Sequence, residues 1–454
     1  MSDELFSDGG FFRWAKNGWQ GLLPPIWSSA ALLFFPFCMP AQSFSKLVEF
    51  ADQAWARGNY AKAAVSYEQA ARLKQNRPAT MLRAAECYYP LRDYAKAAEC
   101  YRYAEAALPK NDLVWLRYGR SLKQAGKPTE ATKVFQSFLG SYASVDREQV
   151  ATIVSLEIKG CQLALQAIEN QKVMDASFSV RRLSDSLNSA QNEFAPIRWN
   201  DDVLYFFTKA TGQTELLRSL RSGEQWQPPR PATGLPVAIW SDLGSGSLSP
   251  DGQRFYYTRC PEEAGSGGVY PPCALYVTRR EATGGWGEPE RLRDYLHLPG
   301  STVMTPFVTH AAGREVLFFA SDRPGGLGGL DLYRCERPLD ADDLDFSFPR
   351  NLGPLVNTLG DELSPYYSPL DAMLSFSSNG HATLGGLDVF QSHPVSNGWA
   401  APSPLGPPFS SSADDLFFVP DRMGKGGILV SNRLLGAAKT STRHNDLFEI
   451  QPLR

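Results

Sequence analysis

The sequence has few of the residues that metal and acid–base chemistry use in clusters. Its five histidines are scattered among 454 residues, and none is spaced with another histidine or a cysteine pair as zinc ligands are. The G-x-S-x-G elbow of serine hydrolases, the H-E-x-x-H metalloprotease motif, the P-loop and the dinucleotide-binding glycine fingerprint are also absent. These absences predict a protein that is not an enzyme, without metal, cofactor or small-molecule substrate.

An excess of positive charge is also missing. With 45 basic and 48 acidic residues the net charge is −3, so no general basic field favours nucleic acid as a partner. Beyond the N-terminal region no apolar run is long enough to span a bilayer. A composition of 43% apolar and 20% charged residues is ordinary for a folded protein and excludes a disordered chain.

Residues 1–41 have the features of an export signal. Arg13 and Lys16 form a weakly positive start, the apolar run 30–37 follows, and Met39-Pro40-Ala41 offers a cleavage point. The alternative is a single membrane anchor, which the short, proline-containing run disfavours. We therefore expect the mature protein in the periplasm, associated with the outer membrane, with membrane contact only through partners.

Seven cysteines are present, and two of them flank a loop rich in glycine and proline. Cys260 and Cys273 could close this loop as a disulfide in an oxidising compartment. The alternative is a pair of free thiols. Four others resemble small core residues: Cys87, Cys100, Cys161 and Cys335.

A period of 34 residues runs through the first third of the chain. Small residues and aromatic residues each recur at this spacing, as in Ala63, Ala97, Ala131 and in Tyr67, Tyr101, Phe135. Small residues let paired helices approach closely, and the aromatic residues fill the space beside them. The period predicts a helical array over residues 42–171, capped by a helix near 146–170. Its concave face could bind a peptide, or the array could serve only as a spacer.

A second period, of 54 to 59 residues, begins near residue 176. Each unit has alternating aromatic strands and a residue–Pro pair, namely Ala195-Pro196, Ser249-Pro250, Thr305-Pro306, Ser364-Pro365 and Val419-Pro420. Five units predict a five-bladed β-propeller over residues 172–454, and hence an α + β multidomain fold. Asn188 precedes Pro196 by the same eight residues that separate Asn357 from Pro365. This match predicts that residues near 176–184 add the outer strand of the last blade and close the ring.

A glycine-rich turn recurs between two strands of the later units. It reads Gly328-Gly329-Leu-Asp331 in the third unit, Gly385-Gly386-Leu-Asp388 in the fourth, and ends in Asp446 in the fifth. Glycine permits a compact loop, and the aspartate can accept hydrogen bonds from loop N–H groups. Because the turn repeats, we interpret it as a structural staple rather than as a calcium or ligand loop.

Together these motifs resemble known repeat families. The 34-residue units resemble tetratricopeptide repeats, and the glycine-rich turn with Leu248-Ser-Pro-Asp-Gly252 resembles the PD40 (WD40-like) propeller repeat. The order of signal, helical repeats and propeller is similar to the N-terminal part of PorE-type envelope proteins of Bacteroidota, which are associated with type IX secretion and gliding. The OmpA-like domain of those proteins has no counterpart in this sequence. The resemblance implies a non-catalytic envelope scaffold whose partners are other envelope proteins.

One alternative assigns the propeller to glycoside hydrolysis or glycan binding. Acidic residues fall near the expected inner strands, where they could converge on a central channel: Glu193, Asp201-Asp202, Asp361-Glu362 and Asp414-Asp415. Three of these carboxylates within reach of one water would support it. For the scaffold, the longest loops, 259–273 and 434–445, are the candidate contact surfaces.

Overall fold

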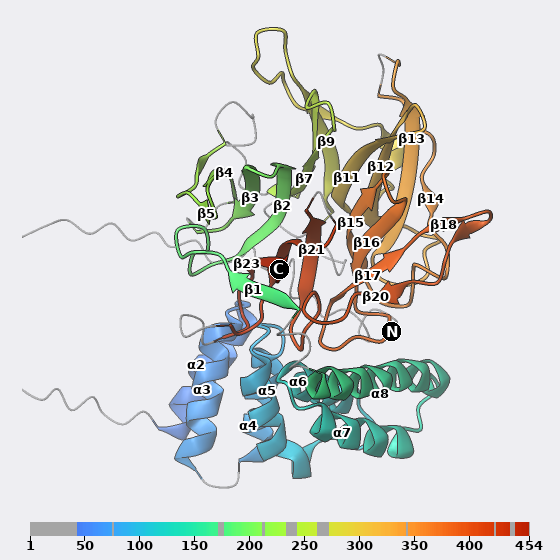
Figure 1. The fold of residues 1–454 in the computed structure, drawn as a ribbon. Helices are drawn as coiled ribbons and strands as arrows, with labels where there is room; N and C mark the ends of the chain where they lie inside the picture. The colour runs from blue at the N-terminus through green and yellow to red at the C-terminus, as the bar shows by residue number, and fades with distance from the viewer. Residues whose placement is uncertain are drawn as a thin grey trace, which may run out of the picture.

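The computed structural model describes residues 43–74, 77–170, 177–210, 214–232, 243–260, 272–341, 344–421, 424–435 and 441–453. Within these ranges a helical region, residues 44–169, precedes a five-bladed β-propeller (Figure 1), which confirms the predicted α + β architecture. The expected export signal lies outside the described residues, as do the link at 171–176 and residues 261–271 and 436–440 of the two loops expected to make contacts.

The helical region consists of successive hairpins in which each helix packs mainly on its neighbours in sequence. The repeated alanines Ala63, Ala97 and Ala131 have no exposed surface, because the partner helix passes directly over them. Among the described residues, no helix has the length and apolarity needed to cross a membrane. The elements are α2 (Phe44–Ala56), α3 (Tyr60–Leu73), α4 (Pro78–Tyr88), α5 (Tyr94–Ala104), η1 (Glu105–Ala107), α6 (Val114–Gln124), α7 (Pro128–Ser141) and α8 (Arg147–Glu169).

The first two hairpins share a polar contact that the third lacks. The Tyr67 hydroxyl donates to Asp52 at 2.5 Å, and 34 residues later the Tyr101 hydroxyl donates to Glu86 at 2.6 Å. In the third hairpin a phenylalanine replaces the tyrosine and Arg120 stands where the acid would be. The charge of this position is therefore reversed at the end of the array that meets α8.

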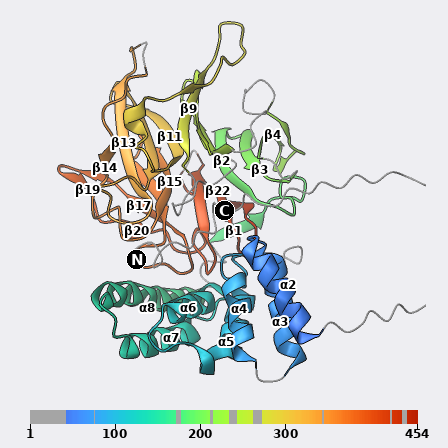
Figure 2. The same ribbon diagram turned by 180° about the vertical axis from the view of Figure 1, so that it is seen from behind.

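Each blade is an antiparallel sheet, four of them four-stranded and the first with a fifth short strand (Figures 1 and 2). The first blade contains β2 (Glu193–Asn200), β3 (Val203–Thr208), β4 (Glu215–Ser222), β5 (Gln225–Trp226) and β6 (Arg230–Pro231). The second contains β7 (Leu243–Leu248), β8 (Arg254–Arg259), β9 (Ala274–Arg279) and β10 (Glu290–Arg291). The third contains β11 (Val303–Ala311), β12 (Arg314–Ser321), β13 (Asp331–Pro338) and β14 (Arg350–Asn351).

The fourth blade contains β15 (Glu362–Ser368), β16 (Met373–Ser378), β17 (Asp388–Ser392) and β20 (Ser403–Pro404), beside a small ribbon of β18 (Pro394–Val395) and β19 (Gly398–Trp399). The fifth contains β21 (Asp415–Pro420), β22 (Gly427–Ser431) and β23 (Asp446–Pro452). Its outermost strand is β1 (Phe178–Arg182), which pairs with β23 and closes the ring.

The two asparagines that suggested closure occupy the same position in their blades. Asn188 accepts from the Leu447 N–H at 2.7 Å, and Asn357 accepts from the Leu332 N–H at 2.8 Å. Each amide group also donates to the carbonyl oxygen of the same leucine. The side chain thus continues the ladder beyond the outermost strand, which fixes the chain as it enters the next blade.

Two of the five Pro pairs do not mark equivalent positions. In the first, third and fourth blades the pair lies at a register shift in the innermost strand, between residues 194/197, 304/307 and 363/366. In the fifth blade the shift lies between Leu416 and Val419, so Val419-Pro420 follows it. In the second it lies between Leu243 and Gly246, well before Ser249-Pro250. The number of blades was predicted correctly, but these two marks were out of register.

Candidate functional site

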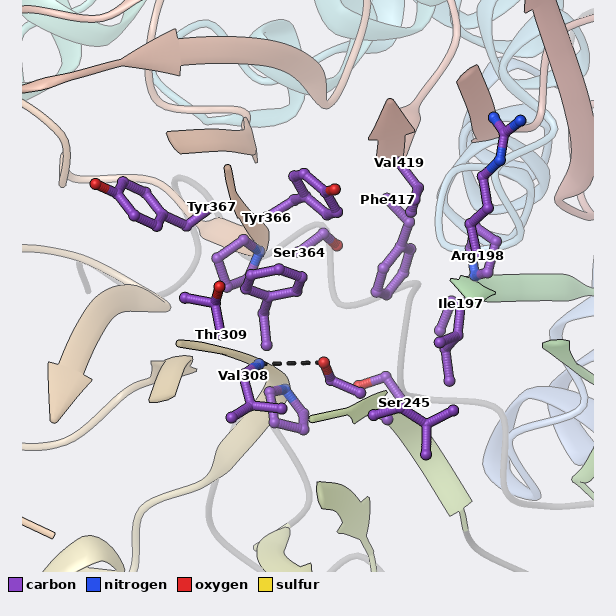
Figure 3. Close-up of a pocket in the computed structure, with 18 of the residues that line it drawn as sticks. Ile197, Arg198, Ser245, Val308, Thr309, Ser364, Tyr366, Tyr367, Phe417 and Val419 are labelled. Carbon is purple, nitrogen blue, oxygen red and sulfur yellow. Dashed lines mark hydrogen bonds between the residues drawn. The ribbon is translucent and has the colours of Figure 1, made fainter. Parts of the chain in front are cut away.

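The innermost strands enclose a cavity on the propeller axis. β2, β7, β11, β15 and β21 pack side by side in a ring, and the space between them measures about 340 Å³ (Figure 3). The register shifts described above lie in the wall of this cavity. Ala195, Thr305, Ser364 and Phe417 adopt left-handed φ values of +46° to +55° there. Such bulges bend the strand and turn its neighbouring side chains toward the axis.

Hydroxyl groups and apolar side chains line the cavity. The Val308 N–H donates to the Ser247 hydroxyl at 3.1 Å, which is the hydrogen bond drawn at Val308 in Figure 3. The Ser364 N–H donates to the Thr305 hydroxyl at 3.3 Å. Arg198 is the one cationic residue in the described wall, and its guanidinium group forms an ion pair with the Asp201 carboxylate at 2.9 Å. Of the described residues that line the cavity, none is Asp or Glu. This wall can bind a neutral ligand or water, but it offers no pair of carboxyl groups for acid–base hydrolysis.

The carboxylates expected at the axis begin the inner strands and point elsewhere. Glu193 accepts from the Ser189 N–H and hydroxyl at 3.0 and 2.7 Å, and Glu362 accepts from the Thr358 N–H and hydroxyl at 2.7 Å each. Burial raises the pKa of Glu193 to about 7 and that of Glu362 to about 8, although these hydrogen bonds oppose the rise. Asp415 accepts from Ser411 in the same way. These side chains fix the turn that leads into each blade.

The adjacent acids join neighbouring blades. Asp361 accepts from the Leu330 N–H at 2.9 Å, and Asp414 accepts from the Leu387 N–H at 3.0 Å. Asp201 and Asp202 lie at the turn between β2 and β3 instead. No group of three or more His, Cys, Asp or Glu side chains able to hold a metal occurs in the described ranges.

The repeated glycine-rich turns are packed directly against the following blade. Asp331 accepts from the Leu327 N–H at 2.7 Å, Asp388 accepts from the Leu384 N–H at 2.6 Å, and Asp446 is paired with Arg182 at 2.9 Å. A Cβ atom built on any of the four glycines would lie within 2.3 Å of an atom of the next blade: Gly328, Gly329, Gly385 and Gly386. The turns therefore act within the fold, since neighbouring chain fills the space around them.

Two of these turns also meet the helical array at a surface that we call the helix–propeller junction. It comprises Arg92, Asp93, Lys123, Gln124, Glu157 and Gly160 of the helices with Thr383, Gly386, Asp414, Thr442, Arg443 and Asn445 of the propeller. Arg92, on the turn between α4 and α5, donates to Asp414 at 2.8 Å and to Asn445 at 3.1 Å. Arg443 pairs with Asp93 at 2.8 Å. Both contacts are made by the fifth blade and the loop before β23.

In the other half of the junction, the propeller turn 383–386 contacts α6 and α8. Lys123 forms an ion pair with Glu157 and donates to the Thr383 hydroxyl at 3.1 Å. Although burial opposes ionisation of Glu157, Lys123 and Arg120 together hold its pKa below the ordinary value. A Cβ atom on Gly160 would lie 2.1 Å from the Thr383 carbonyl oxygen. The propeller turn 383–386 thus lies directly against the helices, as the two domains also do in Figures 1 and 2.

The two cysteines expected to pair are joined. Cys260 and Cys273 form a disulfide between the end of β8 and the start of β9. The remaining described cysteines are buried free thiols, and burial raises the pKa of each.

The chain matches no protein-family model and no curated protein. Among solved structures it is similar to an α-L-arabinofuranosidase from Lactobacillus brevis, with 14% identity over 57% of this chain and 89% of that chain and a TM-score of 0.38. It is also similar to a putative TolB from Agrobacterium tumefaciens, with 18% identity over 56% and 77% and a TM-score of 0.32. The Sgt2 TPR domain from Aspergillus fumigatus covers 28% of this chain and 82% of its own, at 21% identity and a TM-score of 0.21. These likenesses concern the fold alone.

Sequence reasoning named Gly386, Asp414 and the loop 434–445 for other reasons, but it did not predict that they meet the helices. Arg92 and Asp414 are 322 positions apart, and no local pattern relates them. One signal was present: Arg120 interrupts the acidic position held by Asp52 and Glu86. That reversal marks the end of the array where Glu157 of α8 and the propeller replace a further hairpin.

Proposed function

We propose that the protein is a non-catalytic scaffold of the cell envelope, in which a tetratricopeptide array and a propeller are held as one body and bind other envelope proteins. The observation that carries this proposal is the buried helix–propeller junction. The side chains of Arg92 and Asp414 are 5% and 9% exposed, and those of Lys123 and Glu157 are 2% and 8% exposed. The Arg92–Asp414 pair and the Lys123–Thr383 hydrogen bond both cross the junction, so separation of the two parts would break them.

A fixed orientation suits a scaffold because it sets the distance between two partners. The helices lie on one side of the propeller in Figures 1 and 2, so the far sides of both parts are left to bind partners. Neither surface has to move for binding, and rigid surfaces avoid the entropy cost of ordering on association.

The chemistry of the axial cavity agrees with a binding role. Hydrolysis of a glycoside requires two carboxyl groups that flank the bond, at separations of about 5 to 9.5 Å. Here Glu193, Glu362 and Asp415 are each held by their own serine or threonine, and the described cavity wall is formed by hydroxyl and apolar groups. The propeller glycosidase remains the competing function that the experiment below must separate.

The cellular place of the scaffold is proposed from the sequence. The N-terminal apolar segment and the cysteines at 260 and 273 favour export to an oxidising compartment. We place the protein in the periplasm, associated with the outer membrane through its partners. The resemblance to PorE-type proteins favours the type IX secretion or gliding machinery as the assembly it serves.

Affinity capture of the tagged full-length protein from gently solubilised envelopes tests this function. The proposal predicts stoichiometric recovery of envelope proteins, with crosslinks to both the helical array and the propeller. Recovery of the protein alone, together with release of sugar from arabinan or xylan, would assign it to the hydrolases instead. The control is a Glu193→Gln, Asp415→Asn variant. If sugar release is lost in this variant, hydrolysis depends on these carboxylates.

A further inference from the structure

A groove separate from the axial cavity runs between the first and second blades. It measures about 840 Å³, and its described wall carries two tryptophans, one tyrosine and three arginines: Trp199, Trp286, Tyr205, Arg218, Arg230 and Arg280. Trp199 and Leu248 belong to the wall of both the groove and the axial cavity, so the groove opens toward the cavity mouth. Of the described residues that line the groove, none is acidic.

One wall of the groove is a cross-strand row in the first blade. Tyr205 of β3 is opposite Arg218 of β4, and Arg218 is opposite Arg230 of β6. Both guanidinium groups are exposed. Like charges directly opposite each other on neighbouring strands are destabilising. Their juxtaposition therefore costs the free protein stability.

In the third blade the same pairing of two arginines is accompanied by an acidic residue. There Arg334 is opposite Arg350 at the corresponding positions of β13 and β14. Two residues further along β13, Glu336 pairs with Arg334 at 2.6 Å and with Arg314 at 3.2 Å. In the first blade the position two residues after Arg218 is Leu220, which is 46% exposed. The first blade thus has the arginine pair with an exposed apolar side chain in place of the counter-charge.

The second blade supplies the opposite wall. Arg280 forms a bridge to Trp286, and its guanidinium group lies 5.9 Å from the centre of the indole ring. Trp199 packs on Gly252, where a Cβ atom would lie 2.5 Å from the indole ring. Gly252 has a φ of +69°, so the Ser-Pro-Asp-Gly turn both permits the backbone shape and leaves room for the indole. Trp199, at 40% exposure, is thereby held across the boundary between the blades.

We propose that this groove binds an extended, acidic peptide segment of a partner protein, with aromatic or proline side chains of the segment packed on Trp199 and Trp286. This inference rests on the proposed function as a protein-binding scaffold. Tryptophan, tyrosine and arginine are the residues most enriched at the centres of protein interfaces. Arginine clusters recognise acidic motifs through charge-assisted hydrogen bonds.

The mixed character of the wall favours a peptide over other anionic polymers. Exposed Leu220 and the Pro228-Pro229 segment line the groove beside the paired arginines, so the wall offers both apolar and cationic sites. A peptide carries apolar and acidic side chains on one chain and can contact both kinds of site. A nucleic acid would instead require a continuous basic track, which the net charge of −3 does not suggest.

Fluorescence anisotropy on the full-length protein tests the proposal. The probe is a fluorescein-labelled peptide of about ten residues that alternates Glu with Pro and Phe, which extends over roughly 30 Å. We expect saturable binding that weakens as salt is raised, since exposed charges are screened. The same peptide with Lys in place of Glu should not bind.

Three variants assign the binding to the groove. Arg218→Glu and Leu220→Glu each place a carboxylate beside the arginines, as Glu336 does in the third blade, and should weaken binding about tenfold or more. Both should leave the melting temperature unchanged or higher, because they relieve the like-charge pair. Arg350→Glu makes the same charge change in the arginine pair of the third blade, at the position that corresponds to Arg230, and should leave binding unaltered.

Several outcomes would overturn the inference. These are no binding of the acidic peptide, equal loss in the Arg218 and Arg350 variants, or loss that follows a fall in melting temperature. Binding of oligogalacturonate, but not of the peptide, with loss in the groove variants would assign the groove to acidic glycans instead. If envelope partners are still captured by Arg218→Glu protein in full, the groove proposal fails while the scaffold stands. If wild-type protein captures none, the scaffold itself fails.

Discussion

Arg92 and Asp414 form a buried ion pair that joins the second helical hairpin to the fifth blade of the propeller. Arg92 has a left-handed φ of +60°, and its carbonyl oxygen accepts from the Thr442 hydroxyl, so the turn itself is held against the propeller. Asp414 also accepts from the Leu387 N–H, which joins the fourth and fifth blades. One carboxylate therefore links a blade boundary to the helices. Substitution of either residue should destabilise both the helical region and the propeller.

The first prediction concerns this pair. Arg92→Met should lower the free energy of unfolding by about 3 kcal/mol or more, because Asp414 would remain buried without its counter-charge. Asp414→Asn in the same chain should restore part of the loss, since the amide oxygen can still accept from Leu387. Urea unfolding followed by circular dichroism measures both. Arg57→Met, at an exposed site of the helical array, is the control. Equal stabilities of the Arg92 and Arg57 variants would contradict the assignment of the junction.

The second prediction tests the close approach at the glycine-rich turns. A Cβ atom at position 386 would lie 1.9 Å from Asp414 and 2.7 Å from Gln124. Gly386→Ala should therefore destabilise the protein by about 1–3 kcal/mol through forced shifts. Gly140→Ala, in α7 with open space around it, should be neutral or stabilising because alanine favours a helix. Differential scanning calorimetry distinguishes the two, and a neutral Gly386→Ala would show that the turn is loosely packed.

The third prediction is a pH dependence. The pKa of Glu362 is about 8 in the folded protein, against an ordinary value of 4.5. Because the folded value is the higher one, the stabilisation is complete below about pH 4.5 and is lost as the pH rises through about 8. Each pH unit within that window should cost up to about 1.4 kcal/mol.

Glu362→Gln should flatten this dependence. The amide oxygen can accept from the Thr358 N–H while the amide group donates to the hydroxyls of Thr358 and Ser378, so the hydrogen bonds are retained. We expect the variant to lose less stability than the wild type between about pH 5 and pH 9 in urea titrations. Glu224→Gln, at an exposed acid, should follow the wild type. Parallel curves for all three proteins would show that Glu362 is ionised in the fold.

The fourth prediction concerns the disulfide. Cys260 and Cys273 are separated by 13 positions, and closing a loop of about this length stabilises a protein by roughly 3 kcal/mol. The double variant Cys260→Ser, Cys273→Ser should melt at a lower temperature than the wild type under oxidising conditions. Under reducing conditions the two should melt together. A wild type that is insensitive to reductant would indicate that the bond does not form or does not stabilise the second blade.

The periodic parts of this fold were predictable because each repeat shows the same physical requirement again. Ala63, Ala97 and Ala131 recur where two helices touch, and the spacing of Asn188 and Asn357 to their prolines revealed the closing strand. Pro250 and Pro420 gave the wrong position for the register shift in the second and fifth blades. Both have a strand-forming sequence around them but lie beyond the shift. Register depends on pairing between strands, which residue spacing along one strand does not determine.

The surfaces that carry the proposals were not predictable in the same way. The junction unites Arg92 with Asp414 across most of the chain, and the groove depends on Arg218 standing opposite Arg230. Both follow from how strands and hairpins are placed in space; the arginine pair recurs in the third blade, but there Glu336 stands where the first blade has Leu220. The acids expected at the axis were correctly placed near the inner strands, but their side chains bond to the chain that precedes them instead of converging.

The central claim is that the helices and the propeller hold two surfaces at one distance. Double electron–electron resonance between spin labels at Val65→Cys in α3 and Leu370→Cys on the propeller measures that distance directly, since both sites are exposed and the free thiols within the described ranges are buried. A single narrow distance distribution, broadened by Arg92→Met, is the result that we predict. A broad distribution in the otherwise unmodified protein would contradict a fixed scaffold.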